Sequence, residues 1–290
     1  MRKATLVFLA LGLVVASTAF ASNAVRISQI YGWGGNAAAG AWRSDYIELF
    51  NNSCEPVNIA GWSVQYKSST GNFADATTTH RYAPITSGVI PACGYFLVEG
   101  FRHATIGVPL IASDAQAIGP AAPLLNLGGG SGAIALFSDQ VINRTCAQAQ
   151  AVAVDLVGYG LAANCTEGAP NMAADATSSQ AFVRKNGGAQ DTDVNSADFL
   201  IVQVVAQTPT PVVHNSASPP NPDCALACNF GACCLRGTAG ACIVTTAAGC
   251  AAQLPLPGIF VGVGTTCQPT PICAVPTTKT TWGQVKTIYR

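Results

Sequence analysis

Residues 45–66 read DYIELFNNSCEPVNIAGWSVQY, two runs of alternating side chains on either side of a cluster of turn formers. In the first run, Ile47 and Leu49 alternate with Glu48. Because successive side chains of a strand point to opposite faces, this alternation predicts a strand that turns Ile47 and Leu49 toward a core and Glu48 toward water. A strand with one face in water is typical of antiparallel sheets.

The turn and the second run complete a predicted hairpin. Asn51-Asn52-Ser53 ends the first strand, because Asn and Ser favour turns, and Gly61 permits a bulge. The alternation then resumes and places Trp62, Val64 and Tyr66 on one face of the next strand. The same pattern along the chain predicts these inward side chains: Val57, Ile59, Trp62, Val64, Tyr66, Phe96 and Val98 (or Leu97 in their place), Ile134, Leu136, Val154, Leu156, Leu200 and Val202.

Short strands of this kind recur through residues 22–204, separated by clusters of Gly, Pro and Ser. No segment there shows the apolar spacing of an amphipathic helix. The fold class is therefore predicted to be all-β, with two antiparallel sheets packed against each other.

Five sequence blocks give this prediction a family resemblance. In order they are the segments at 25–31, 45–66, 90–98, 132–137 and 153–160, the last reading AVDLVGYG, and residues 179–185 and 191–199 look like a closing segment. Together they resemble the lamin tail domain over about two thirds of the chain. The resemblance implies an immunoglobulin-like antiparallel β-sandwich, and a role as a binding or attachment module of the kind that accompanies secreted and surface hydrolases.

The first 21 residues have the features of a secretory signal peptide. Arg2 and Lys3 precede an apolar run at 5–15, and Ala19-Phe20-Ala21 is a small-x-small cleavage site. The run is shorter than the roughly 20 residues of a membrane-spanning helix. We therefore expect a secreted protein, extracellular or at the cell surface, with no transmembrane segment.

Charge is scarce and unevenly distributed. Charged residues make up 10% of the chain, against about 25% in typical globular domains. Residues 22–223 hold 8 basic and 14 acidic side chains, a net charge of −6, whereas residues 224–290 hold 4 basic and no acidic ones. Because nucleic-acid affinity depends on Lys and Arg that neutralise phosphates, an acidic main domain excludes nucleic acid as the expected partner.

Twelve cysteines in a secreted chain predict disulfides. Four are spread over the sandwich and eight crowd into residues 224–273, which contain too little apolar sequence to bury a core unaided. Cys146 is expected to pair with Cys165, and Cys54 with Cys93 at one end of the sandwich. Zinc is disfavoured, because no C-x-x-C pair is present. The cysteines are Cys54, Cys93, Cys146, Cys165, Cys224, Cys228, Cys233, Cys234, Cys242, Cys250, Cys267 and Cys273.

The predicted organisation has five parts. Residues 1–21 form the signal peptide, residues 22–204 the sandwich, and residues 205–223 a Pro-rich linker that is stiffened toward an extended course. Residues 224–273 form a small disulfide-rich, loop-rich module, and residues 274–290 a basic aromatic tail. In a helix, Trp282, Val285 and Tyr289 of that tail would share one side, which suggests a docking or sorting segment; a frayed terminus is the alternative.

Two loops carry candidate ligand-binding side chains. Trp33 and Trp42 flank a Gly-rich loop and are candidate binding aromatics, with packing onto the sandwich as the alternative. Asp191, Asp193, Asn195 and Asp198 place oxygen donors at positions 1, 3, 5 and 8 of a loop. They are a candidate calcium site, although the loop lacks the Gly and the terminal Glu of an EF-hand and also fits a simple turn. No other cofactor is expected.

Catalytic residues are not evident. Ser131 lies in a Gly-rich turn that departs from a nucleophile elbow, and His80, His103 and His214 fall in separate loop or linker segments. Glu48 and Asp155 are expected to be structural. The sequence therefore favours a non-enzymatic binding, attachment or self-assembling module whose partner is a protein, a surface glycan or itself. A secreted hydrolase with an active site assembled from dispersed loops is the alternative.

Overall fold

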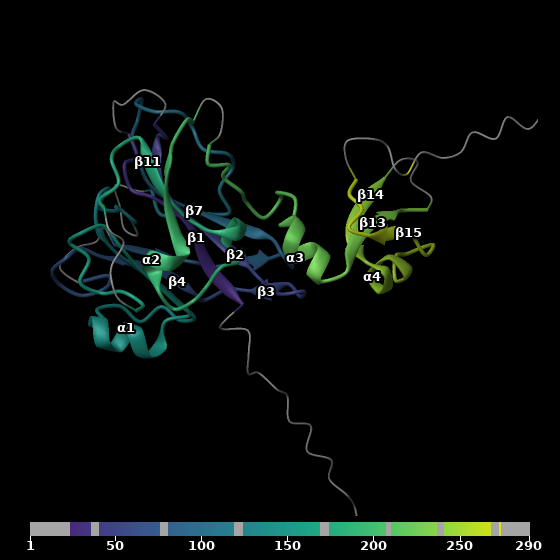
Figure 1. Cartoon of the computed structure of the whole chain (residues 1–290), viewed down its shortest axis with the longest axis horizontal. Helices are drawn as coiled ribbons and strands as arrows, with labels where there is room; N and C mark the ends of the chain where they lie inside the picture. Colours follow the sequence, from purple (N-terminus) through teal and green to yellow (C-terminus); the bar gives the residue numbers. More distant parts are fainter. Residues whose placement is uncertain are drawn as a thin grey trace, which may run out of the picture.

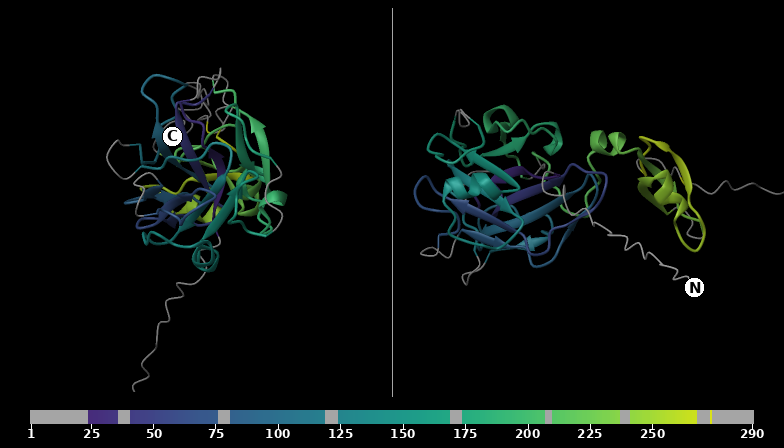
Figure 2. Two further views of the ribbon diagram at one scale, coloured as in Figure 1. Left: turned by 90° about the vertical axis from the view of Figure 1, so that its left-hand side faces the viewer. Right: turned by 90° about the horizontal axis from the view of Figure 1, so that it is seen from below.

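The structure is a computed structural model that describes residues 24–35, 41–75, 81–118, 124–168, 174–206, 210–236, 241–267 and 273. These residues form a β-sandwich and a smaller C-terminal module beside one end of it, with a short helix between them (Figures 1 and 2). The predicted signal peptide and the tail residues Trp282, Val285 and Tyr289 lie outside the described residues. No helix among the described residues has the length and apolar character needed to cross a membrane.

The larger sheet of the sandwich has six strands in the spatial order β12-β11-β1-β2-β7-β8. Neighbouring strands pair antiparallel except β7 and β8, which are parallel. The strands are β1 (Val25–Tyr31), β2 (Ser44–Asn51), β7 (Tyr95–Arg102), β8 (Ala115–Gln116), β11 (Gln180–Arg184) and β12 (Phe199–Gln203).

The second sheet has four strands in the order β10-β9-β4-β5, and all of its pairs are antiparallel. Its strands are β4 (Ser63–Lys67), β5 (Tyr82–Pro84), β9 (Gly132–Phe137) and β10 (Asp155–Tyr159). A separate two-stranded pair joins β3 (Val57–Asn58) and β6 (Val89–Ile90). The helical turns of the sandwich are α1 (Cys146–Val152), η1 (Asn186–Gly188) and α2 (Asn195–Asp198). The predicted all-β class is confirmed.

The largest apolar cluster of the sandwich draws side chains from both sheets. Trp62 is buried there, as the alternation in residues 45–66 predicts. Leu200 was expected to face inward, but its side chain is 52% exposed. It lies on the edge strand β12, where Phe199 is buried on the opposite face. Two other predicted side chains, Leu97 and Leu156, are buried in other clusters, and Val154 and Val202 are half-buried. The predicted side chains that belong to the largest cluster are Val57, Ile59, Trp62, Val64, Tyr66, Phe96, Val98, Ile134 and Leu136.

Strand β2 is buried on both faces, which the sequence does not predict. Ile47 and Leu49 face the core as expected, but Glu48 is only 1% exposed rather than directed to water. Tyr46 and Leu97 form a second apolar cluster on the Glu48 side of the sheet. The expectation for Glu48 is wrong because this outer face is itself covered by other parts of the chain.

Part of that cover comes from residues 210–221, within the segment predicted to be an extended linker. Val213 is buried in the second apolar cluster, and Asn221 is also buried. The backbone N–H of Ser216 donates to Oδ2 of Asp114 and the Ser216 hydroxyl donates to Oδ1, while the Asn215 side chain donates to the Ala112 carbonyl. These residues form a strap along the sandwich, and we refer to 210–221 as the strap below.

The C-terminal module contains a three-stranded antiparallel sheet in the order β14-β13-β15. Its strands are β13 (Phe230–Cys234), β14 (Cys242–Thr246) and β15 (Ile259–Val263), and its helices are α3 (Pro222–Ala227) and α4 (Ala247–Ala251). Disulfides within it join Cys233 to Cys250, Cys234 to Cys273 and Cys242 to Cys267. The sheet is small, so these cross-links take the place of a large core.

Candidate functional site

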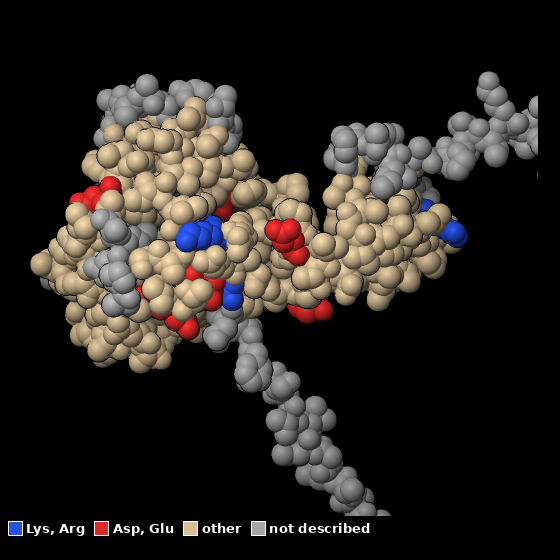
Figure 3. All heavy atoms as spheres, in the orientation of Figure 1, with Lys and Arg blue, Asp and Glu red and all other residues tan. Residues whose placement is uncertain are grey.

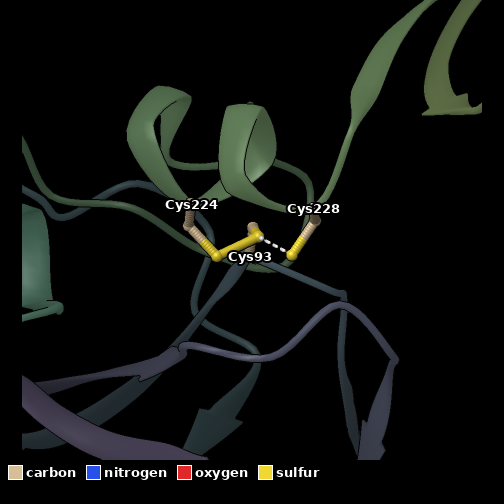
Figure 4. A group of neighbouring side chains, drawn as sticks. All are labelled: Cys93, Cys224 and Cys228. Atoms are coloured by element: carbon tan, nitrogen blue, oxygen red, sulfur yellow. Dashed lines mark hydrogen bonds between the residues drawn. A yellow bond between two sulfur atoms is a disulfide. The ribbon is translucent and has the colours of Figure 1, made fainter. Parts of the chain in front are cut away.

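Two disulfides fasten the C-terminal module to the sandwich. Cys54 bonds to Cys228 and Cys93 bonds to Cys224, with Cα separations of 5.3 and 5.5 Å. The two bonds lie in contact, since the sulfurs of Cys93 and Cys228 are 3.5 Å apart (dashed line in Figure 4). The predicted Cys54–Cys93 bond is therefore wrong, whereas the Cys146–Cys165 bond is present as predicted.

Helix α3 places its two cysteines for these bonds. Asn221 caps the helix, because its side-chain oxygen accepts hydrogen bonds from the backbone N–H groups of Asp223 and Cys224. Pro222 follows at the first helical position, where its fixed φ suits a helix start. Residues four apart share one face of a helix, so Cys224 and Cys228 both point toward the sandwich. Figure 4 shows them flanking Cys93.

Glu48 holds the strap beside these two disulfides. We call the two bonds, Cys54–Cys228 and Cys93–Cys224, the junction. The backbone N–H of His214 donates to Glu48 Oε2 at 2.6 Å, and His214 Nδ1 lies 3.1 Å from the same oxygen. The imidazole stacks on Tyr95, with ring centroids 4.2 Å apart. Ser28 and Gln29 donate the remaining hydrogen bonds to the carboxylate. Glu48 is therefore a buried anchor for the strap, in agreement with the structural role expected for it.

The described surface of the module carries almost no charge and exposes several large apolar side chains. Arg236 is the only charged residue in the sequence from 224 to 273, and Figure 3 shows the module as mostly tan. Strand β15 lies at the edge of its sheet, and its exposed side chains alternate with half-buried ones. The exposed apolar residues, which we call the apolar edge, are Leu226 (55%), Leu254 (90%), Leu256 (51%), Ile259 (51%), Val261 (41%) and Val263 (47%).

The two candidate binding aromatics pack onto the sandwich. Trp42 is 2% exposed and belongs to the second apolar cluster, so its ring is not available for stacking on a ligand. Trp33 is half-buried, its ring lies against Gly129, and its indole N–H donates to the Ala176 carbonyl at 3.1 Å. The packing alternative describes both residues.

The four candidate calcium ligands are engaged in different contacts. Asn195 is buried and its side chain bonds backbone groups of Leu156, Gly158 and Glu167. Asp198 is also buried, and it accepts hydrogen bonds from the backbone and hydroxyl of Thr192. Contacts of this kind are those of a turn that is fastened to its neighbours. Asp191 pairs with Arg184, and Asp193 lies on the surface.

Asp191 also belongs to a group of three carboxylates near Arg184. Side-chain oxygens of Asp155, Glu167 and Asp191 lie within 4.8 Å of one another. Arg184 is fully buried and donates to Asp155 at 2.7 Å and to Asp191 at 3.2 Å. Its positive charge therefore offsets part of the negative charge of the three carboxylates. Glu167 lines a cleft of about 240 Å³. Burial raises the pKa of Glu167 to about 8, and the charges of Asp155 and Asp191 act in the same direction.

The potential catalytic residues remain dispersed. Ser131 precedes β9 in the predicted turn, and its buried hydroxyl has no hydrogen-bond partner in the part of the chain that the structure describes. His103 bonds backbone N–H groups of its own loop, and His214 bonds Glu48. His80 lies outside the described residues. These contacts bring no histidine to Ser131.

Comparison with known families identifies a domain within the sandwich. Residues 18–161 match the family model of the Lamin Tail Domain. The chain carries a lamin tail domain. The match ends after β10, so β11 and β12 extend the larger sheet beyond the matched part of the lamin tail domain.

A solved structure that matches is that of a DUF4876 family protein from Bacteroides thetaiotaomicron. It is 13% identical in sequence, the match covers 61% of this chain and 70% of that one, and the TM-score is 0.41. No curated protein matches the chain.

The sequence reasoning missed both the junction and the apolar edge. A signal for the apolar edge was present, because Ile259, Val261 and Val263 alternate with Phe260 and Gly262 in the manner of a strand. No local signal pointed to the junction. Its four cysteines come from segments 131 and 174 residues apart.

Proposed function

We propose that this protein is an exported, non-enzymatic attachment module that assembles with copies of itself through the apolar edge. The lamin tail domain supports a binding or structural role in general. Six disulfides are typical of proteins that fold in an oxidising compartment, and residues 1–21 have the features of a signal peptide.

The observation that carries the proposal is the apolar edge on a module held by disulfides. Exposed edge strands without charge pair readily with other strands, and proteins that avoid such pairing place Lys or Pro on them. Residues 259–263 contain neither. A second copy is the favoured partner because pairing of two apolar edges brings no charges together. Contact through the sandwiches is disfavoured, since both are acidic and repel each other.

Sedimentation velocity of the mature protein tests the proposal. We expect the wild type to form dimers or larger species as its concentration rises, and Val261→Lys to remain monomeric because it buries a charge in the contact. Val141→Lys is the matched control, since Val141 is an exposed valine of the sandwich at 59%. A wild type that stays monomeric, or two variants that behave alike, contradicts self-assembly through this edge. Binding of the apolar edge to a glycan or to another protein also contradicts it.

A further inference from the structure

A cleft of about 210 Å³ opens at the opposite side of β2 and β7 from the junction, where β2 begins and β7 ends. Its walls combine charged, polar and apolar side chains. They are Arg43, Ser44, Glu99, Arg102, Pro109, Leu110, Ile111, Ala112, Ser113 and Gln116. The volume is below the roughly 300 to 1,000 Å³ of sites for drug-sized ligands, so the cleft suits a single ring or a short chain.

Glu99 makes the polar wall rigid. Its side chain is 4% exposed and accepts hydrogen bonds from Ser44 at 2.6 Å, from Arg102 Nε at 2.7 Å and from Ser113 at 3.0 Å. Burial alone would raise the pKa of Glu99, but the bonds from Arg102 and Ser44 outweigh it and lower the pKa. The carboxylate is therefore ionised and fully engaged, and it fixes the donors around it.

Arg43 lines the cleft and carries a donor that no described residue uses. Its backbone is held on both sides, since its N–H donates to the Val108 carbonyl and its carbonyl accepts from His103. Its Nε is buried and has no hydrogen-bond partner among the described residues. A buried guanidinium N–H without an acceptor is costly, and a carboxylate is the acceptor whose geometry fits it best.

The charges of the cleft differ from those of the rest of the domain. Two arginines and one glutamate line it, a net charge of +1, in a segment whose overall net charge is −6. Pro109, Leu110 and Ile111 offer an apolar wall for a carbon skeleton. We propose that this cleft binds a small carboxylate-bearing ligand, with the carboxylate on Arg43 and the skeleton against residues 109–111. The site is independent of the apolar edge.

Isothermal titration of the mature protein tests the site with four probes: glucuronate, lactate, glucose and inorganic phosphate. Glucuronate and lactate both carry a carboxylate, and glucose is the neutral counterpart of glucuronate. We expect at least one of the acids to bind about tenfold or more tightly than glucose, because only a carboxylate meets the Arg43 guanidinium. Preference for glucuronate identifies an acidic sugar as the ligand, and preference for lactate a small organic acid; both uphold the site. Equal binding of glucose and glucuronate overturns it, as does tighter binding of inorganic phosphate.

Two variants locate the binding. Arg43→Gln removes the charge, and Ile111→Trp fills the cleft without a change of charge; we expect each to weaken binding of the acid about tenfold or more. Arg81→Gln is the matched control, because Arg81 lies over the Tyr66 ring of the other sheet, outside the cleft. Thermal melts verify that the variants are folded, and Ile111→Trp decides the matter if Arg43→Gln is not. Unchanged binding in the folded variants overturns the proposal.

Discussion

Glu167 and Arg184 show how the environment of single residues controls the stability of the sandwich. The guanidinium of Arg184 is buried among three carboxylates, and it bonds Asp155 and Asp191 directly. Fewer hydrogen bonds offset the burial of the Glu167 carboxylate. Its Oε1 accepts a hydrogen bond from the backbone of Leu156, but its buried Oε2 has no partner among the described residues. Burial and the neighbouring charges of Asp155 and Asp191 therefore favour its protonated form.

The raised pKa of Glu167 predicts that the free energy of unfolding falls as the pH rises. An unfolded glutamate has a pKa of about 4.3, and in the folded protein the pKa of Glu167 is raised to about 8. The folded state therefore holds the proton more tightly, and its contribution to stability is full below about pH 4 and is lost as the pH rises through 8. Asp45 acts in the same direction, because burial raises its pKa to about 7. Glu167→Gln should reduce this pH dependence and raise stability at pH 8.

Urea unfolding at pH 5 and pH 8 measures the effect. The matched control is Glu55→Gln, because Glu55 is exposed and should leave the difference between the two pH values as it is in the wild type. If Glu167→Gln retains the full wild-type difference, then Glu167 is ionised throughout this range and the expectation fails.

Among the elements, the strands of residues 45–66 were predictable because alternation is local. Trp62, Val64 and Tyr66 share a face in the sequence and share the core in the structure. The same reasoning failed for Leu200, because alternation says which side chains share a face but not which face is covered. It failed for Glu48 as well, since the cover over that face includes residues 212–214, far along the chain.

Trp62 and Leu200 provide a matched test of this difference. Both were expected to face inward, but the side chain of Trp62 is 8% exposed and that of Leu200 is 52% exposed. Trp62→Ala should cost about 3 to 5 kcal/mol of the free energy of unfolding through lost burial and a cavity. Leu200→Ala should cost about 0.5 kcal/mol or less, as for other surface changes. Denaturant melts of the two variants decide the matter, and similar losses would show that β12 is buried in solution.

The calcium prediction also belongs to an element, the loop that leads into α2. The loop contacts are those of a turn, and calcium binding there stays a prediction that a thermal melt can test. Millimolar calcium that raises the melting temperature, with the response lost in Asp193→Asn, would support a site at Asp191, Asp193, Asn195 and Asp198.

At the scale of the whole molecule, the sandwich and the module are one cross-linked unit. The predicted boundary at 223 and 224 separates two regions of different composition, but the bonds of Cys224 and Cys228 cross it. Composition could not reveal this arrangement, because pairing among twelve cysteines depends on which loops the fold brings together. The strap and helix α3 then set the position of the module beside the sandwich (Figures 1 and 2).

Removal of both junction disulfides should release the module. We expect a fourfold Cys→Ser variant at Cys54, Cys93, Cys224 and Cys228 to show a larger radius of gyration in small-angle X-ray scattering than the wild type. Cys146→Ser with Cys165→Ser is the matched control, because that bond lies within the sandwich and spans only 19 residues. An unchanged radius in the fourfold variant would mean that noncovalent contacts at α3 and the strap are sufficient to hold the module.

The two junction disulfides can form only late in synthesis. A ribosome makes Cys93 131 residues before Cys224, and Cys54 174 residues before Cys228. While the sandwich emerges from the ribosome, the native partners of these two thiols have not yet been made. Cys54 and Cys93 can then react with each other. A bond formed between them must later be exchanged by attack of a thiolate from the late-arriving helix. A chain shortened to its first 204 residues never receives that helix, so the lamin tail domain of this protein cannot form the native bonds of Cys54 and Cys93 when produced alone.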